Sequence, residues 1–166
     1  MSDQSDLSAR TTPSQTIGPF FRFGFDWIDA THLVDPDHEG AIVLEGSVLD
    51  GAGDPVPDAV VEIWQADEAG TFPTTTSGGG AWEPGFGRCL TDEVGRFRFV
   101  TVTPGAVDAG SLPHIDVSVF ARGLLQRVVT RIYLPGTDLD ATVADWALGY
   151  RFDIVVAGHL ATPTEA

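Results

Sequence analysis

His114 and Asp116 are a pair of residues whose types and spacing could bind a metal ion, in the run PHIDVSVF at residues 113–120. In a β-strand, side chains two positions apart point to the same face, so the imidazole and the carboxylate would lie within reach of one ion. A protein metal site usually has three or four ligands. Two ligands from one strand do not complete such a site, and we expect no metal bound by this chain alone.

Two other side chains deserve a chemical interpretation. Cys89 lies in a predicted strand, which favours a buried structural thiol over a nucleophile. Arg122 ends a predicted strand, where its guanidinium could bind a ligand carboxylate in bidentate fashion or form an internal ion pair. The other histidines are interpreted as solvated side chains: His32, His38 and His159. The sequence has no nucleophile elbow, phosphate loop, dinucleotide-binding glycine pattern or cysteine pair.

The elements that position these residues are predicted to be β-strands. Apolar runs alternate with polar residues and are separated by Gly, Asp and Pro clusters, which favour chain reversals. The cluster at 50–55 predicts a chain reversal, and residues 89–102 a hairpin with its turn at 92–95. Ile115, Val117 and Val119 should share one face. We expect an all-β fold, an antiparallel β-sandwich with an extended N-terminal arm and at most one short helix, at 138–148.

The chain is expected to form one domain with tails. We assign a disordered N-terminal tail to residues 1–11, an arm and irregular lead-in to 12–40, the sandwich to 41–158 and a C-terminal tail to 159–166. Because exposed phenyl rings are unfavourable in water, Phe20 and Phe21 should be buried, against either this sandwich or another chain.

Composition excludes several function classes. The 166 residues carry a formal net charge of −15, and all nine basic residues are arginines, which disfavours nucleic-acid binding. No apolar run reaches the about 18–20 residues of a membrane span, and the first residues lack the apolar core of a signal peptide. A single cysteine favours a reducing, cytoplasmic location.

Several blocks of the sequence resemble the intradiol ring-cleaving dioxygenase family, which has a prealbumin-like sandwich. They are TPSQTIGPFF (12–21), GSVLDGAGDPVPDAVVEIWQADEAGTF (46–72), GRCLTDEVGRFRF (87–99), PHIDVSVFARG (113–123) and TRIYLPG (130–136). More narrowly, they resemble the α chain of the members that combine homologous α and β subunits. In those members the β subunit binds Fe(III) through two tyrosinates and two histidines, and the ring of protocatechuate opens between its hydroxyls with O₂.

This chain departs from the iron-binding pattern of the family. The resemblance places the first tyrosinate at Phe72, the second in the loop that contains Ala106 and Val107, and the two histidines at His114 and Asp116. Three of the four ligands are therefore missing, and the only tyrosines, Tyr133 and Tyr150, lie in other blocks. The resemblance implies a vestigial site in a chain without iron, with Fe(III) held by the partner β subunit.

The same resemblance assigns a positive role to the arm. It implies that Thr16, Gly18, Pro19, Phe20 and Arg122 complete the pocket of the partner for a small aromatic acid and O₂, within an αβ hetero-oligomer. Phe20 stands where the family commonly has tyrosine. Two alternatives remain: a stand-alone β-sandwich binding or accessory module, and a self-sufficient dioxygenase acting on catechol or hydroxyquinol, which the missing ligands disfavour.

Overall fold

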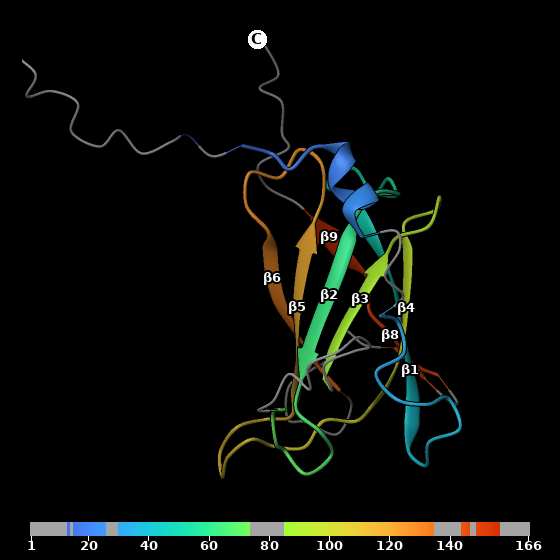
Figure 1. The fold of residues 1–166 in the computed structure, drawn as a ribbon, viewed down its shortest axis with the longest axis vertical. Helices are drawn as coiled ribbons and strands as arrows, with labels where there is room; N and C mark the ends of the chain where they lie inside the picture. Colours follow the sequence, from blue (N-terminus) through green and yellow to red (C-terminus); the bar gives the residue numbers. More distant parts are fainter. Residues whose placement is uncertain are drawn as a thin grey trace, which may run out of the picture.

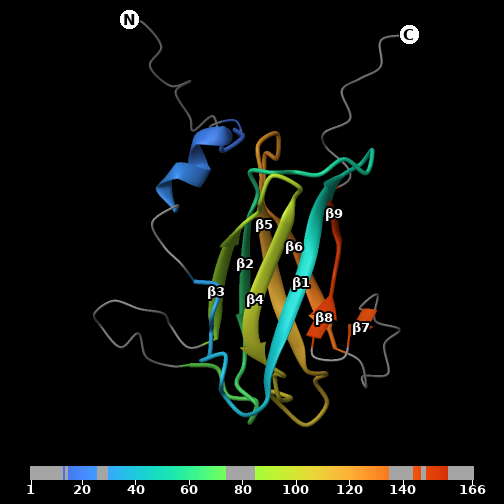
Figure 2. The same ribbon diagram turned by 90° about the vertical axis from the view of Figure 1, so that its right-hand side faces the viewer.

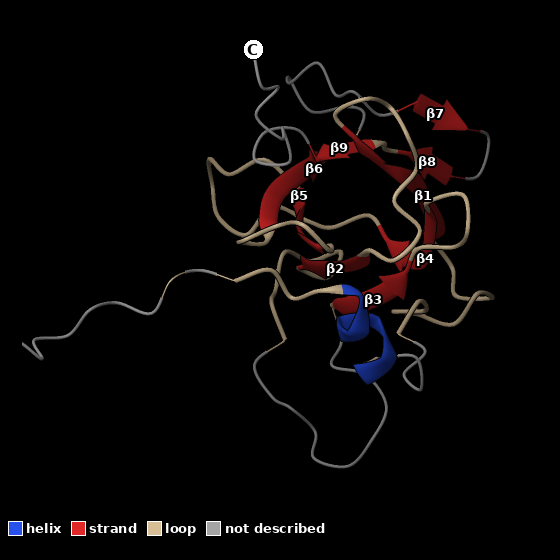
Figure 3. Cartoon of the chain, turned by 90° about the horizontal axis from the view of Figure 1, so that it is seen from above, coloured by secondary structure: helices blue, strands red, loops and turns tan. Residues whose placement is uncertain are grey.

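Two β-sheets lie face to face in the computed structural model of the chain (Figures 1 and 2), and the view from above shows the two layers (Figure 3). The structure describes residues 13, 15–25, 30–73, 85–134, 144–146 and 149–156. The apolar core lies between the sheets and contains Leu44 and Phe99 from one sheet with Ile63 and Val117 from the other, all at most 1 % exposed. No helix in the described part of the chain is long and apolar enough to cross a membrane.

The first sheet is built on the long strand β1 (Ala41–Asp50). One edge of β1 pairs antiparallel with β4 (Arg96–Val102). Its other edge pairs parallel with β8 (Gly149–Arg151) and then β9 (Ile154–Val156), while β7 (Ala144–Trp146) pairs antiparallel with β8. The sheet is therefore mixed rather than purely antiparallel, because residues 149–156 run alongside β1 in the same direction.

The second sheet is antiparallel throughout, in the order β3 (Phe86–Leu90), β2 (Val60–Gln65), β5 (His114–Phe120) and β6 (Val128–Tyr133). Along β5 the alternation is as predicted: Ile115, Val117 and Val119 are buried in the core, while His114 and Asp116 lie on the outer face. The outer face of this sheet therefore carries the potential ligands.

The hairpin predicted around the turn at 92–95 is wrong in its pairing, although the turn forms: β3 and β4 flank it but belong to different sheets. The chain reversal predicted at 50–55 is confirmed, since the Val56 N–H donates to the Val48 carbonyl at 2.9 Å across it. In the turn at 92–95, the Asp92 carboxylate accepts hydrogen bonds from the backbone N–H groups of Val94 and Arg96. Such local chemistry specifies a chain reversal, but not the neighbours with which the flanking strands pair.

Helix placement also differs from the prediction. The arm is not extended throughout, since a 3₁₀ helix, η1, spans Pro19–Gly24. Proline suits the first turn of a helix because its φ is already helical and its missing N–H would have no partner there. Of the helix predicted at 138–148, the described residues 144–146 are strand instead. The predicted tails at 1–11 and 159–166, the rest of that helix, and His159 lie outside the described residues.

Candidate functional site

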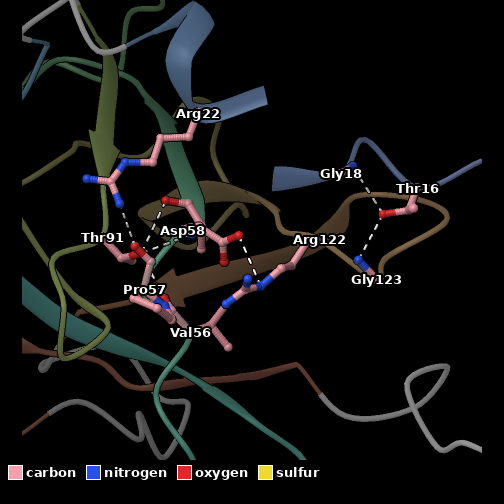
Figure 4. A network of polar contacts seen from close by, with 10 residues as sticks. Thr16, Gly18, Arg22, Val56, Pro57, Asp58, Thr91, Arg122 and Gly123 are labelled. Atoms are coloured by element: carbon pink, nitrogen blue, oxygen red, sulfur yellow. Dashed lines mark hydrogen bonds and ion pairs between the residues drawn. The ribbon is translucent and has the colours of Figure 1, made fainter. Parts of the chain in front are cut away.

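The N-terminal arm is attached to the residues that follow β5. The Thr16 hydroxyl accepts hydrogen bonds from the backbone N–H of Gly123 at 2.8 Å and from that of Gly18 at 3.3 Å (Figure 4). Farther along the arm, the ring of Phe21 packs 5.4 Å from that of Phe120. Three of the positions singled out in the sequence, Thr16, Gly18 and Arg122, therefore lie in one region of this chain.

Arg122 forms an ion pair with Asp58, in which the Nε atom lies 3.1 Å from Oδ2 (Figure 4). The Asp58 side chain is 10 % exposed, and neither carboxylate oxygen accepts a hydrogen bond of good geometry from the part of the chain that is described. The Arg122 side chain is 56 % exposed. Asp58 thus holds one edge of the guanidinium, while the remainder of the group faces outward.

The corner that carries Asp58 is fixed from two further directions. Arg22, in η1, donates a hydrogen bond from Nη1 to the carbonyl of Pro57 at 2.9 Å. The Thr91 hydroxyl donates to the carbonyl of Val56 at 2.8 Å and accepts from the N–H of Ala59 at 3.0 Å. The arm helix therefore contacts Pro57 and Arg122 contacts Asp58, so that these two adjacent residues fix the position of the helix relative to Arg122.

Of the two phenyl rings expected to be buried, Phe21 is half-buried against this sandwich, whereas this chain does not cover Phe20. Phe20 is 78 % exposed and lies near Phe23, with ring centroids 6.1 Å apart. Ile17 and Phe23 are also exposed. Pro19 begins η1. The arm thus keeps one side on its own sandwich and leaves an apolar surface, defined by Ile17, Phe20 and Phe23, in contact with solvent.

The positions that the resemblance assigns to a vestigial metal site meet on the outer face of the second sheet. Phe72 stacks on Trp64, with ring centroids 5.9 Å apart and an interplanar angle of 7°. Trp64 lies opposite Asp116 in the register of β2 and β5, and His114 Nε2 is 3.8 Å from Asp116 Oδ2. The shared face expected for His114 and Asp116 is therefore confirmed, and Phe72 lies on the same side of the sheet.

A guanidinium lies among these groups. Arg131 Nε donates to Asp116 Oδ1 at 2.8 Å, and this hydrogen bond, followed by the interaction with Tyr133, raises the pKa of Arg131. The ring of Tyr133 is 5.9 Å from that of His114. The sequence interpretation missed Arg131 and Tyr133, because only the pairing of β5 with β6 places them opposite Asp116 and His114.

The residues at these positions do not fit a four-ligand Fe(III) centre. The side chains of Phe72, Ala106 and Val107 have no donor atom, and the Asp116 carboxylate is already paired with a cation. His114 Nδ1 lies 2.8 Å from the Leu112 carbonyl and can donate to it, which leaves only Nε2, 3.8 Å from Asp116 Oδ2, as a potential ligand atom of the ring. Within the described ranges, no three His, Cys, Asp or Glu side chains form a potential metal site.

Cys89 lies in β3, as the sequence predicted, and is partly buried against the core. Its Sγ atom is 3.3 Å from the carbonyl of Leu90. These contacts agree with a packing role for the thiol.

Comparison with known proteins identifies the family. The family model described as Dioxygenase matches residues 26–158. Two chains from Burkholderia cepacia are each 38 % identical: the protocatechuate 3,4-dioxygenase β chain over 158 residues (75 % of this chain, 67 % of that chain) and the α chain over 141 residues (75 % and 70 %). The chain belongs to the intradiol dioxygenase family. The α chain from Pseudomonas putida is 36 % identical over 138 residues (74 % and 68 %).

Solved structures of the intradiol dioxygenase family agree with the fold. The dioxygenase domain of a carbohydrate-binding fusion from Streptomyces sp. SirexAA-E has a TM-score of 0.62 and 26 % identity, and the match covers 89 % of this chain and 99 % of that domain. Catechol 1,2-dioxygenase from Acinetobacter sp. ADP1 has a TM-score of 0.59 and 22 % identity, and the match covers 75 % of this chain and 55 % of that chain. At this level of identity, the similarity shows a shared fold alone. Since the α and β chains of Burkholderia cepacia match this chain at equal identity, overall similarity does not distinguish the two subunit types.

Proposed function

We propose that this chain is the α subunit of a cytoplasmic protocatechuate 3,4-dioxygenase and acts with a homologous β subunit. The partner would bind the Fe(III), at which O₂ opens the protocatechuate ring between its two hydroxyls to give 3-carboxy-cis,cis-muconate. The similarity to both kinds of protocatechuate 3,4-dioxygenase chain supports this assignment to a two-subunit enzyme.

The observation that carries the α assignment is the position of Arg131. Its guanidinium donates a hydrogen bond to Asp116 and interacts with Tyr133, beside His114, where the resemblance places part of the iron site. A fixed positive charge there opposes a second cation. The unsubstituted ring of Phe72, stacked on Trp64, offers no phenolate. Both features favour a chain that supports catalysis by its partner.

In this proposal, the residues of the chain bind and orient. The outward part of the Arg122 guanidinium would face the partner's pocket and either orient the carboxylate of the aromatic acid or anchor the arm. Asp58 would hold it in place, since a paired guanidinium has fewer accessible orientations. Ile17, Phe20 and Phe23 would be buried on association, which removes apolar surface from water and excludes water from the pocket.

Reconstitution tests the proposed function. Each chain is purified alone and after co-expression with the candidate β chain, and O₂ consumption is followed with protocatechuate. The co-purified complex should consume O₂ and the lone α chain should not. If the lone chain cleaves protocatechuate, the α assignment is overturned. If the two chains fail to co-purify, the stand-alone binding or accessory module replaces it.

A further inference from the structure

A groove of about 550 Å³ lies over the outer face of the first sheet and extends to Thr31, His32 and Cys89 at the edge next to β4. β4, β1 and β8 lie side by side in Figure 2 and form its floor. Glu45 and Ser47 line it, while their neighbours Leu44 and Val48 point into the core. A volume of this size is typical of sites for small molecules.

The groove concentrates positive charge on an acidic protein. Three of the nine arginines of the chain line it, namely Arg96, Arg98 and Arg151, in a chain whose net charge is −15. Because ions in solution screen distant charges over about 8 Å, an anion that enters the groove interacts mainly with these nearby guanidinium groups. The lining carries three guanidinium groups against the two carboxylates of Glu45 and Asp92, so the local charge is less unfavourable to an anionic ligand than the overall charge.

The acidic groups that line the groove are already engaged. Glu45 accepts a hydrogen bond from Arg98 Nε at 3.0 Å, and Asp92 accepts backbone N–H groups within its turn. By contrast, the Arg96 guanidinium makes no ion pair or side-chain hydrogen bond within the residues that the structure describes. Arg96 is exposed and retains its full set of donors for a ligand.

A buried hydroxyl lies between the arginines. Ser47 lies opposite Arg96 in the register of β1 and β4 and is only 6 % exposed. Arg151 donates from Nη2 to the Ser47 Oγ atom at 3.5 Å, so Oγ serves as an acceptor and its own proton remains available to donate. Arg151 also forms an ion pair in which Nε donates to Asp153 Oδ1 at 3.3 Å, which limits its orientations and leaves its Nη groups to contact a ligand.

Strand spacing indicates the size of the ligand. Arg96 and Arg151 project from β4 and β8, the two neighbours of β1, and adjacent strands lie about 4.8 Å apart, so their backbones are about 10 Å apart. Two carboxylates on a short carbon chain span such a gap better than one compact anion. We propose that this groove binds a small di- or tricarboxylate, with one carboxylate on Arg96, another on Arg151 and the Ser47 hydroxyl donating between them.

Calorimetric titration of the full chain tests this site, with propane-1,2,3-tricarboxylate and succinate as probes and with acetate and inorganic phosphate as comparison anions. The tricarboxylate should bind at least about tenfold more tightly than acetate or phosphate, since each added charge-assisted contact contributes about a factor of ten or more. Equal affinity for phosphate, or no binding of either polycarboxylate at millimolar concentration, would overturn the proposal.

Single arginine variants test whether the tricarboxylate binds in this groove. Arg96→Gln should weaken tricarboxylate binding about tenfold or more, and Arg151→Gln should weaken it similarly, which keeps the test valid if one variant does not fold. Arg127→Gln is the matched control, because Arg127 is exposed and lies outside the groove, and it changes the net charge equally. An equal loss of affinity in Arg127→Gln would show a general charge effect and would contradict the assigned site.

Discussion

Asp58 and Arg122 form an ion pair of unequal exposure, in which the carboxylate is buried and more than half of the guanidinium side chain is exposed. Removing the cation leaves a buried negative charge without compensation, which costs more than the pair itself contributes. We predict that Arg122→Ala lowers the free energy of unfolding by about 1–3 kcal/mol, measured by urea denaturation. The double variant Arg122→Ala/Asp58→Asn should recover part of this loss.

The matched control for that series is Arg127→Ala, which removes an exposed arginine without an ion pair in the described ranges. It should change the free energy of unfolding by less than about 0.5 kcal/mol. If Arg122→Ala is as stable as Arg127→Ala, the buried carboxylate does not depend on Arg122.

The Thr16 hydroxyl attaches the arm to the chain through the Gly123 amide. We predict that Thr16→Val, which keeps the shape of the side chain but removes the acceptor, increases hydrogen exchange at the Gly123 N–H several-fold. The change should be absent in Thr103→Val, a control at an exposed threonine outside the arm. Unchanged exchange at Gly123 in the Thr16 variant would mean that the arm is held by other contacts.

Adjacent phenylalanines of η1 are predicted to behave differently. In the isolated chain, Phe21→Ala should cost about 1–2 kcal/mol of unfolding free energy because Phe21 packs on Phe120, while Phe20→Ala should cost less than about 0.5 kcal/mol. Under the proposed function, Phe20→Ala should weaken association with the β subunit, measured by analytical ultracentrifugation of mixtures. Tight association of the Phe20 variant would exclude Phe20 from the interface.

Gly46 lies in β1 where no side chain fits. A Cβ atom at this position would approach the Phe152 carbonyl and the Phe97 ring too closely, whereas one at Gly51 meets nothing within 4 Å. Gly46→Ala should therefore lower the free energy of unfolding by about 3 kcal/mol or more, and Gly51→Ala should leave it nearly unchanged. Urea denaturation of the two variants measures the difference, and equal stability would contradict the close packing of β1 against residue 152.

Much of the fold can be predicted from sequence, because strand alternation and turn residues are local signals. The run at 113–120 predicts both the strand β5 and its inward face. Sheet membership is not local: the turn at 92–95 has hairpin chemistry, yet its flanking strands join different sheets. Likewise, nothing near Asp58 in the sequence indicates that it pairs with Arg122, or that Tyr133 lies beside His114, since both contacts depend on tertiary pairing.

The central claim is that this chain does not hold iron and that its β partner does. The direct measurement is metal content and the visible absorption spectrum of this chain purified alone, and again after co-expression with the candidate β chain, because tyrosinate bound to Fe(III) absorbs in the visible. We predict a colourless, iron-free lone chain and a coloured complex with iron. A lone chain with stoichiometric iron and a tyrosinate band would contradict the account and would direct attention to Tyr133, beside His114.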